Sequence, residues 1–350
     1  MKKIIVISVI IFNLCNQCYS QDIHFSQYNE SPMTLNPALT GGFNGQIRAG
    51  LYYRDQWRSV TTPFRTIACA ADVSNITNNW KSGYLAPGIV FYSDKAGDGK
   101  MGITQVNLSI ASGILVNGNN TVAAGLQGGF TQHSVNFNDL EWGNQYTNGA
   151  YNASQPTGET PDGENFSFAD FSSGIMWNYK IGETNISSNN AFAVKLGVSV
   201  FHINQPLLSY YNGTNEGSKL YRKYTIHGSV EKGLKSTNIT LIPGFAYYNQ
   251  GAAREVIAGC KVRYIMKKGS QYTGYKKGSA FNFGGYYRFK DAFVALVQIE
   301  FANYAVSFSY DINASGLTAV SSSRGGFEIT LHFINPNPFQ YKRYIHTPMM

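Results

Sequence analysis

The sequence predicts an all-β protein, a transmembrane antiparallel β-barrel of about 14 strands behind an irregular N-terminal segment. Apolar and polar residues alternate with a period of two in stretch after stretch, as from Phe192 to Val200, which gives each strand one apolar face. These stretches run to roughly 10 to 13 residues, against about 5 to 6 for strands of soluble sheets and about 9 to 11 for tilted membrane strands. Their number is even, as closure of an antiparallel bacterial barrel normally requires.

Residues 1–20 have the pattern of a secretory signal peptide. Lys2 and Lys3 precede the apolar run Ile4–Phe12, and Cys18-Tyr19-Ser20 presents small residues at the two positions that a signal peptidase reads. The run is too short to span a membrane. A lipoprotein anchored through Cys15 or Cys18 is the alternative, which the residues before each cysteine disfavour because they lack the usual small-residue context.

Residues 21–45 are rich in Ser, Asn, Pro and Gly and predict irregular structure before the first strand. This leader contains the turn Asn36-Pro37-Ala38, and fatty-acid transport barrels carry a similar Asn-Pro-Ala in an N-terminal plug. The leader therefore has two interpretations, a plug folded into the lumen and a disordered periplasmic segment, and the sequence favours neither. The barrel is expected over residues 46–334 and a tail over 335–350.

Fourteen segments carry the strand pattern, and turn-forming residues separate them. In order they are Gln46–Trp57, Arg65–Asn75, Gly83–Asp94, Met101–Ser112, Asn120–Gln132, Phe166–Tyr179, Asn190–His202, Leu220–Lys232, Asn238–Asn249, Arg254–Met266, Ser279–Phe289, Asp291–Glu300, Asn303–Asp311 and Gly325–Phe333. In a barrel the apolar side of each strand faces lipid and the other side, which includes Lys195 and Ser199, lines the lumen.

Strand order also predicts which connections lie on which side of the membrane. Both chain ends of such barrels normally face the periplasm, so the long connection between the fifth and sixth strands, residues 133–165, falls outside. Aromatic residues near strand ends are expected at the membrane interfaces, namely Tyr52, Trp57, Tyr92, Trp177, Tyr179, Tyr247 and Tyr287. Two soluble periplasmic β-domains are the alternative, since a sandwich shows the same alternation.

Composition narrows the function classes. Charged residues make up only 14%, and the formal net charge of +8 becomes +6 (8 minus 2) once Lys2 and Lys3 leave with the signal. No basic-aromatic patch indicates nucleic-acid binding, and there is no nucleophile elbow, phosphate loop or dinucleotide fingerprint. We therefore predict no catalytic residue, cofactor or metal ligand. Cys69 and Cys260 fall on the apolar sides of their strands and are expected to be small apolar residues, not a disulfide.

Charge is segregated along the chain. No Lys or Arg occurs between Met101 and Tyr179, and the long outer connection is acidic, whereas lysines crowd the turn between the tenth and eleventh strands. We hypothesise that the acidic loop meets an exported partner or Ca²⁺, and that the basic turn docks a periplasmic component. Ordinary solvated charge is the competing explanation. The candidate partner contacts are Asp139, Glu141, Glu159, Asp162 and Glu164 in the loop, and Lys267, Lys268, Lys276 and Lys277 in the turn.

Several stretches resemble the PorP/SprF family of outer-membrane proteins of the type IX secretion system, found in Bacteroidetes. The first two are Gln21-Asp22-Ile23-His24-Phe25-Ser26-Gln27-Tyr28 and Leu35-Asn36-Pro37-Ala38-Leu39, followed by Tyr53-Arg54-Asp55-Gln56-Trp57 and Phe201-His202-Ile203-Asn204-Gln205-Pro206. The last three are Tyr287-Arg288-Phe289-Lys290-Asp291-Ala292, Ser309-Tyr310-Asp311-Ile312 and Arg324-Gly325-Gly326-Phe327-Glu328. They occur in the family's order along the whole mature chain. The matching positions are Asn36, Pro37, Ala38, Arg54, Trp57, His202, Pro206, Asp291, Tyr310, Asp311, Gly325 and Gly326.

The resemblance implies an outer-membrane barrel of about fourteen strands. It also implies a role in exporting a large surface adhesin, including adhesins used for gliding, and in holding it at the membrane through its C-terminal domain. Other type IX secretion components in the periplasm or outer membrane and the lipid bilayer are the further implied partners, and no catalytic residue is implied. A porin or hydrophobic-compound transporter and a barrel enzyme are the competing classes.

Overall fold

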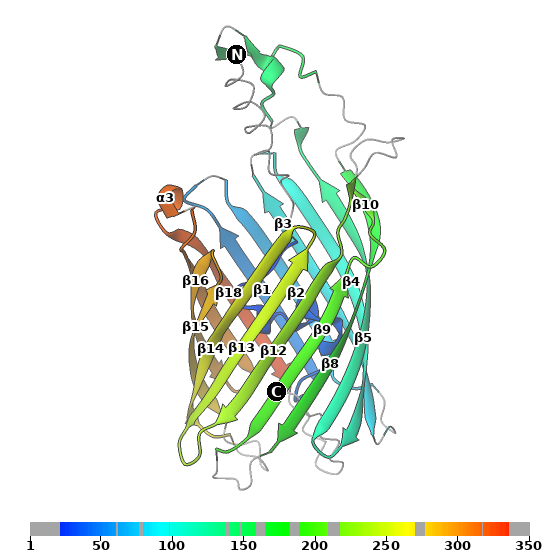
Figure 1. Ribbon diagram of the computed structural model, residues 1–350, viewed down its shortest axis with the longest axis vertical. Coiled ribbons are helices and arrows are strands. Elements are labelled where there is room, and N and C mark those ends of the chain that lie inside the picture. Colours follow the sequence, from blue (N-terminus) through cyan, green and yellow to red (C-terminus); the bar gives the residue numbers. More distant parts are fainter. Residues whose placement is uncertain are drawn as a thin grey trace, which may run out of the picture.

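A computed structural model describes residues 22–60, 62–76, 80, 82–97, 99–137, 140–147, 149–158, 165–182, 189–208, 218–269, 277–316 and 318–335. Its strands close into an antiparallel barrel in which each strand pairs with its neighbours in the chain and the first pairs with the last (Figure 1). The predicted signal peptide and nearly all of the predicted tail lie outside the described residues.

Each of the fourteen predicted strands is confirmed. The barrel strands are β1 (Ile47–Gln56), β2 (Phe64–Val73), β3 (Gly83–Ala96), β4 (Met101–Asn117), β5 (Asn120–Ser134), β8 (Asn165–Ile181), β9 (Phe192–Phe201), β12 (Lys223–Gly233), β13 (Ile239–Gln250), β14 (Ala253–Lys267), β15 (Ser279–Arg288), β16 (Ala292–Phe301), β17 (Tyr304–Asn313) and β18 (Arg324–Asn335). Differences at the ends amount to a few residues, except that β4 extends five residues beyond Ser112.

The two faces of the wall follow the alternation in the sequence. On β9, Leu196 and Val198 are 44% and 51% exposed on the outside, whereas Ser199 is buried inside. Because this alternation recurs along the barrel strands, the barrel presents mainly apolar side chains to the surrounding lipid and mainly polar ones to its lumen. Cys69 and Cys260 lie on the outward parity and are free thiols, as expected.

Two of the predicted interfacial aromatics are wrong. Tyr52 and Tyr92 point into the barrel, where Tyr52 is 5% exposed and packs on the ring of Phe25 at 5.6 Å. Tyr52 shares the inward parity of Arg54 on β1, and Tyr92 that of Val90 on β3. An aromatic ring near a strand end can therefore pack against the segment that fills the lumen, as well as lie at a membrane interface.

The connections give the two ends of the barrel different shapes. One end, called the loop end, carries the hairpins β6 (Tyr146–Thr147)–β7 (Ala150–Tyr151) and β10 (Leu207–Leu208)–β11 (Ser218–Lys219), the 3₁₀ turn η4 (Gly143–Gln145) and the short helix α3 (Thr318–Ser321). At the other, the terminal end, β1 begins and β18 ends. Among the described residues no helix is long and apolar enough to cross a bilayer.

The leader fills the lumen, which decides between its two interpretations in favour of the plug. Residues 22–43 form the 3₁₀ turns η1 (Tyr28–Glu30) and η2 (Pro37–Leu39) and the single helical turn α2 (Pro32–Leu35), and none of these residues is exposed. In Figure 1 the plug is the dark blue segment inside the barrel. Asp22 contacts the loop end through Gln250, so the plug runs the length of the lumen before β1 begins at the terminal end.

Candidate functional site

The plug is attached at four levels, and the first lies at the loop end. The Asp22 carboxylate is 2.5 Å from Nε2 of His202 and 3.8 Å from Nζ of Lys223, and its backbone N–H donates to Gln250. His202 follows β9, and its Nδ1 lies 2.9 Å from Asp170. The imidazole of His202 therefore lies between the carboxylates of Asp22 and Asp170 and holds the first described residue of the plug.

Both members of the first pair are charged at neutral pH. Burial works against the charged form of each, but the attraction between them prevails. Burial alone would raise the pKa of Asp22, whereas His202 and then Lys223 hold it well below its usual range. For His202, burial lowers the pKa, and the two aspartates raise it to about 9. The contact is therefore an ion pair, which is stronger than a neutral hydrogen bond.

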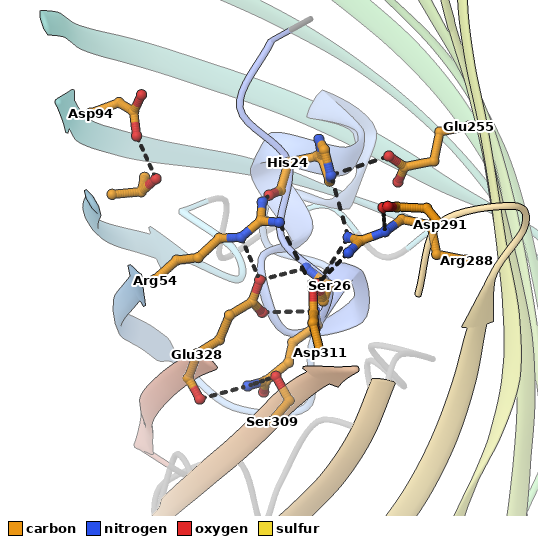
Figure 2. A network of polar contacts seen from close by, with 12 residues as sticks. His24, Ser26, Arg54, Asp94, Glu255, Arg288, Asp291, Ser309, Asp311 and Glu328 are labelled. Atoms are coloured by element: carbon orange, nitrogen blue, oxygen red, sulfur yellow. Dashed lines mark hydrogen bonds and ion pairs between the residues drawn. The ribbon is translucent and has the colours of Figure 1, made fainter. Parts of the chain in front are cut away.

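The second level is a buried ion-pair network around Ser26 and Gln27 (Figure 2). The backbone N–H groups of these two residues donate to the two carboxylate oxygens of Glu328, at 2.7 and 2.9 Å. The Ser26 hydroxyl donates to Asp311 at 2.7 Å. Two consecutive amides and one hydroxyl of the plug thus donate hydrogen bonds to two carboxylates of the barrel wall.

Two arginines of the wall neutralise these carboxylates. Arg54 Nε lies 3.2 Å from Glu328, and its Nη1 donates to the His24 carbonyl. Arg288 Nη2 lies 2.6 Å from Asp311 while its Nε contacts Asp291 at 2.6 Å. The side chains of Arg54, Arg288, Asp311 and Glu328 are at most 6% exposed. A carboxylate buried this deeply depends on its partners, because removing one leaves an uncompensated charge.

The third level lies in the middle of the lumen. The Glu30 carboxylate meets Lys261 Nζ at 3.0 Å, accepts from the Gln298 amide at 3.1 Å and lies 3.6 Å from His332. Beside it the Tyr28 and Tyr286 rings pack edge to face at 5.7 Å.

The Asn36-Pro37-Ala38 turn is seated against β5, β8 and β9. The Asn36 side chain caps η2 by accepting from the Ala38 N–H at 2.9 Å, and its amide donates to the carbonyls of Ile175 and Val198. Asn36 is fully buried, so these bonds satisfy an amide that would otherwise be costly to bury.

Glycine in the wall makes this seat possible. Gly125 on β5 pairs directly with Gly174 on β8. A Cβ on Gly125 would lie 2.4 Å from the Pro37 backbone, and one on Gly174 would lie 2.0 Å from Asn36 Oδ1. Both distances are too short for a real contact. Only glycine at these two positions therefore lets the plug turn lie directly against the wall.

The fourth level closes the plug at the terminal end. Asp72 on β2 accepts from the Gly41 N–H at 2.7 Å and forms a two-point pair with Arg48 on β1 at 2.9 and 2.7 Å. Arg48 also donates to the Leu39 carbonyl and lies over the Phe43 ring. The plug is therefore fixed from one end of the lumen to the other.

The family-motif positions divide between the plug contacts and the loop-end rim. Asn36, Pro37, Ala38, Arg54, His202 and Asp311 take part in plug attachment. Asp291 reaches the same network through Arg288. The remaining positions make backbone contacts or face outward. The Trp57 N–H donates to the Gly325 carbonyl, and the Leu220 N–H donates to the Pro206 carbonyl. Gly326 passes close to the Asp55 backbone, and Tyr310 is half-buried on the outer face.

The structure does not bring the predicted partner contacts together. Glu141 lies at the loop end, where it accepts from the Tyr146 hydroxyl at 2.5 Å. Lys267 ends β14 at the terminal end, and Lys268 and Lys277 belong to the β14–β15 connection that follows it. Asp139, Glu159, Asp162, Glu164 and Lys276 lie outside the described residues. Glu141 and the described lysines therefore lie at opposite ends of the barrel.

Sequence reasoning did not select the residues that hold the plug most directly. Glu328, Arg288, Asp72, Lys261 and Glu30 were not candidates, although the first two lie in stretches that resemble the family. A signal was available, because a charged residue on the inward parity of a strand with an apolar outer face must find a partner inside the barrel. In the described part of the chain no three or more His, Cys, Asp or Glu side chains gather as a metal ion would require.

Comparison with protein families matches residues 17–333 to the family described as type IX secretion system membrane protein PorP/SprF. No curated protein matches.

Solved barrels are similar in architecture at low sequence identity. The CymD monoaromatic hydrocarbon channel is 10% identical with a TM-score of 0.43, over 88% of this chain and 94% of its own. The toluene transporter TbuX of Ralstonia pickettii is 10% identical with a TM-score of 0.45, over 88% and 93%. A FadL homologue of Pseudomonas aeruginosa is 9% identical with a TM-score of 0.46, over 86% and 92%.

Proposed function

Because the chain belongs to the PorP/SprF family of type IX secretion system membrane proteins, we propose that this outer-membrane barrel aids the export of a large adhesin and attaches it to the cell surface by binding its C-terminal region. Gliding motility is the expected use of such an adhesin. The other proposed partners are type IX secretion components of the periplasm or outer membrane. No catalytic role is proposed.

The observation that carries the proposal, beside the family, is the filled lumen. The plug is attached at four levels by ion pairs and by hydrogen bonds to its backbone, and its Asn36-Pro37-Ala38 turn is seated against the wall. A lumen occupied in this way leaves the rims as the surfaces offered to other proteins. We assign the loop end, with Glu141 and the β6–β7 hairpin, to the exported partner, and the lysines of the β14–β15 connection to a periplasmic component.

A porin or hydrophobic-compound transporter remains the second candidate, and the plug distinguishes it. A transporter must let its plug move for every molecule that passes, so the purified barrel alone would take up ligand or conduct ions steadily. An attachment protein keeps its plug docked until a partner binds.

Deletion of the protein is expected to remove one large adhesin from the cell surface while other outer-membrane proteins stay at normal levels. Surface labelling followed by mass spectrometry measures this, and the same adhesin should copurify with the tagged barrel from detergent-solubilised membranes. Normal adhesin display in the deletion strain, together with steady ligand uptake by the purified barrel in liposomes, would establish the transporter instead.

Charge reversal of Lys267, Lys268, Lys276 and Lys277 to glutamate is expected to reduce adhesin display several-fold, because opposite charges across an interface steer association and like charges suppress it. Flow cytometry with an antibody to the adhesin measures the change. Lys235→Glu, in the neighbouring β12–β13 turn, is the control for added negative charge. Normal display in the fourfold variant, with the barrel present at its usual level, would show that this rim docks nothing required for export.

A further inference from the structure

A compact charged cluster lies on the outer face of the wall at the loop end, apart from the plug. Asp55 has the outward parity of β1 but is only 1% exposed, because two arginines cover it. Arg58 contacts it through Nε at 3.1 Å and Nη2 at 2.6 Å, and Arg65 on β2 through Nε at 3.4 Å. The Tyr53 hydroxyl donates to it at 3.3 Å. One carboxylate thus positions two guanidinium groups on the surface.

The cluster carries an excess of positive charge that faces outward. Arg58 and Arg65 are 60% and 54% exposed, and Lys95 on β3, which is exposed, stands directly opposite Arg65 in the strand register. Three cations and one carboxylate leave a net charge of about +2 at this rim. A guanidinium group has more N–H donors than one carboxylate can accept, so the remaining donors of Arg58 and Arg65 can bind an oxyanion.

Aromatic residues place the cluster at the edge of the membrane. Trp57 and Phe64, the neighbours in sequence of Arg58 and Arg65, pack edge to face at 5.0 Å. Tryptophan beside arginine is typical of the level at which apolar lipid gives way to head groups. The cations therefore stand where the charged part of a lipid lies.

An apolar groove lies further along the same strands, toward the terminal end. It has a volume of about 380 Å³ and lies on the outer face of β18, β1, β2 and β3. Its floor is formed by the small residues Ala49, Cys69 and Ala71, and larger side chains flank it. The flanking residues are Leu51, Ile89, Phe91, Leu331 and Phe333. Cys69 follows Arg65 by four residues, which is about 13 Å along the strand.

We propose that this surface binds one membrane lipid whose head group carries a phosphate monoester, with an acyl chain in the groove. Arg58, Arg65 and Lys95 hold the phosphate by charge-assisted hydrogen bonds, which for arginine are bidentate. The acyl chain runs past Tyr53 and Ile67 into the groove. The site needs both parts, because a basic rim alone attracts any anion and an apolar groove alone accepts any chain.

Lipid binding by this surface is tested by native mass spectrometry of the purified barrel in detergent micelles doped with bisphosphorylated lipid A or with its dephosphorylated form. The wild-type protein is expected to retain the phosphorylated lipid about tenfold better, because the dephosphorylated form offers no phosphate for charge-assisted hydrogen bonds. Arg58→Gln with Arg65→Gln should abolish this preference, and Ala71→Phe, which fills the groove, should reduce retention of both lipids.

Two further variants keep the test decisive. Arg254→Gln, an exposed arginine on β14 across the barrel, is the control and should bind as the wild type does. Removing both arginines leaves Asp55 unpaired, so Lys95→Gln, which leaves the carboxylate and its arginines intact, is measured as well and should lower the preference about threefold. Equal retention of the two lipids by the wild type, or an unchanged preference in both the double variant and Lys95→Gln, would overturn the proposal.

Discussion

Replacing Glu328 by glutamine is expected to detach the first part of the plug from the barrel wall. The carboxylate accepts the amides of Ser26 and Gln27 on its two oxygens and pairs with Arg54. A glutamine offers one oxygen and directs its NH₂ group at an N–H, so one plug amide loses its acceptor and the buried Arg54 loses its nearest carboxylate. Breaking a buried pair in this way costs about 3–5 kcal/mol.

Hydrogen exchange of the segment 22–35 measures the effect. If local opening governs exchange, this cost corresponds to an acceleration of roughly 10² to 10³·⁵-fold, and single barrels in planar bilayers should show larger and more frequent conducting events. Glu300→Gln is the matched control, because Glu300 is a carboxylate of the same lumen whose partners, Arg263 and Asn282, lie on the strands. Unchanged exchange in Glu328→Gln would show that the other three levels hold the plug without this one.

The barrel could be predicted from the sequence because its determinant is local. Apolar and polar residues alternate over about ten consecutive residues of each strand, because one side of the strand faces lipid along its whole length. Leu196, Val198 and Ser199 therefore fell on the correct faces. The pairing order needed no further information, since each strand pairs with its neighbour in the chain.

The position of the leader could not be predicted in the same way. Its contacts join residues far apart in sequence: Ser26 and Glu328 are separated by 302 positions, and Asn36 and Val198 by 162. No pattern within residues 21–45 reports which wall residues they meet. The sequence marked the Asn36-Pro37-Ala38 turn, but the feature that seats it, a pair of glycines on two other strands, has meaning only once the register is known.

The two misplaced tyrosines have the same origin. An aromatic residue near a strand end predicts a membrane interface only if the lumen is open, and here the plug offers a second apolar surface. Tyr52 lies two residues from Arg54 and so faces the same side of the strand. The alternation along the strand therefore predicted the direction of the side chain better than the residue type did.

The Asn36-Pro37-Ala38 seat leads to the second large effect: Gly125→Val is expected to expel this turn while the barrel still folds. The new Cβ would lie 2.4 Å from the Pro37 backbone and 2.5 Å from the Ala38 nitrogen, and backbone atoms cannot rotate away as a side chain can. Overpacking costs about 1–3 kcal/mol, and each Asn36 hydrogen bond lost adds about 1 kcal/mol. Valine itself suits a strand, so the wall is not weakened.

Thiol labelling reports the position of the plug. In a background in which Cys69 and Cys260 are alanine, a cysteine replacing the half-buried Thr34 should react with a membrane-impermeant maleimide at least about tenfold faster when Gly125→Val is present, which corresponds to about 1.4 kcal/mol. Gly128→Val is the matched control on the same strand, since its Cβ points to the outer face and meets only the Phe171 ring at 3.4 Å. Fast labelling in both variants would indicate a general loosening of β5, whereas slow labelling in both would mean that the wall yields to the plug. Fast labelling in Gly125→Val alone is the result that assigns the glycine to the seat, because the two substitutions differ only in the face of the strand on which the valine stands.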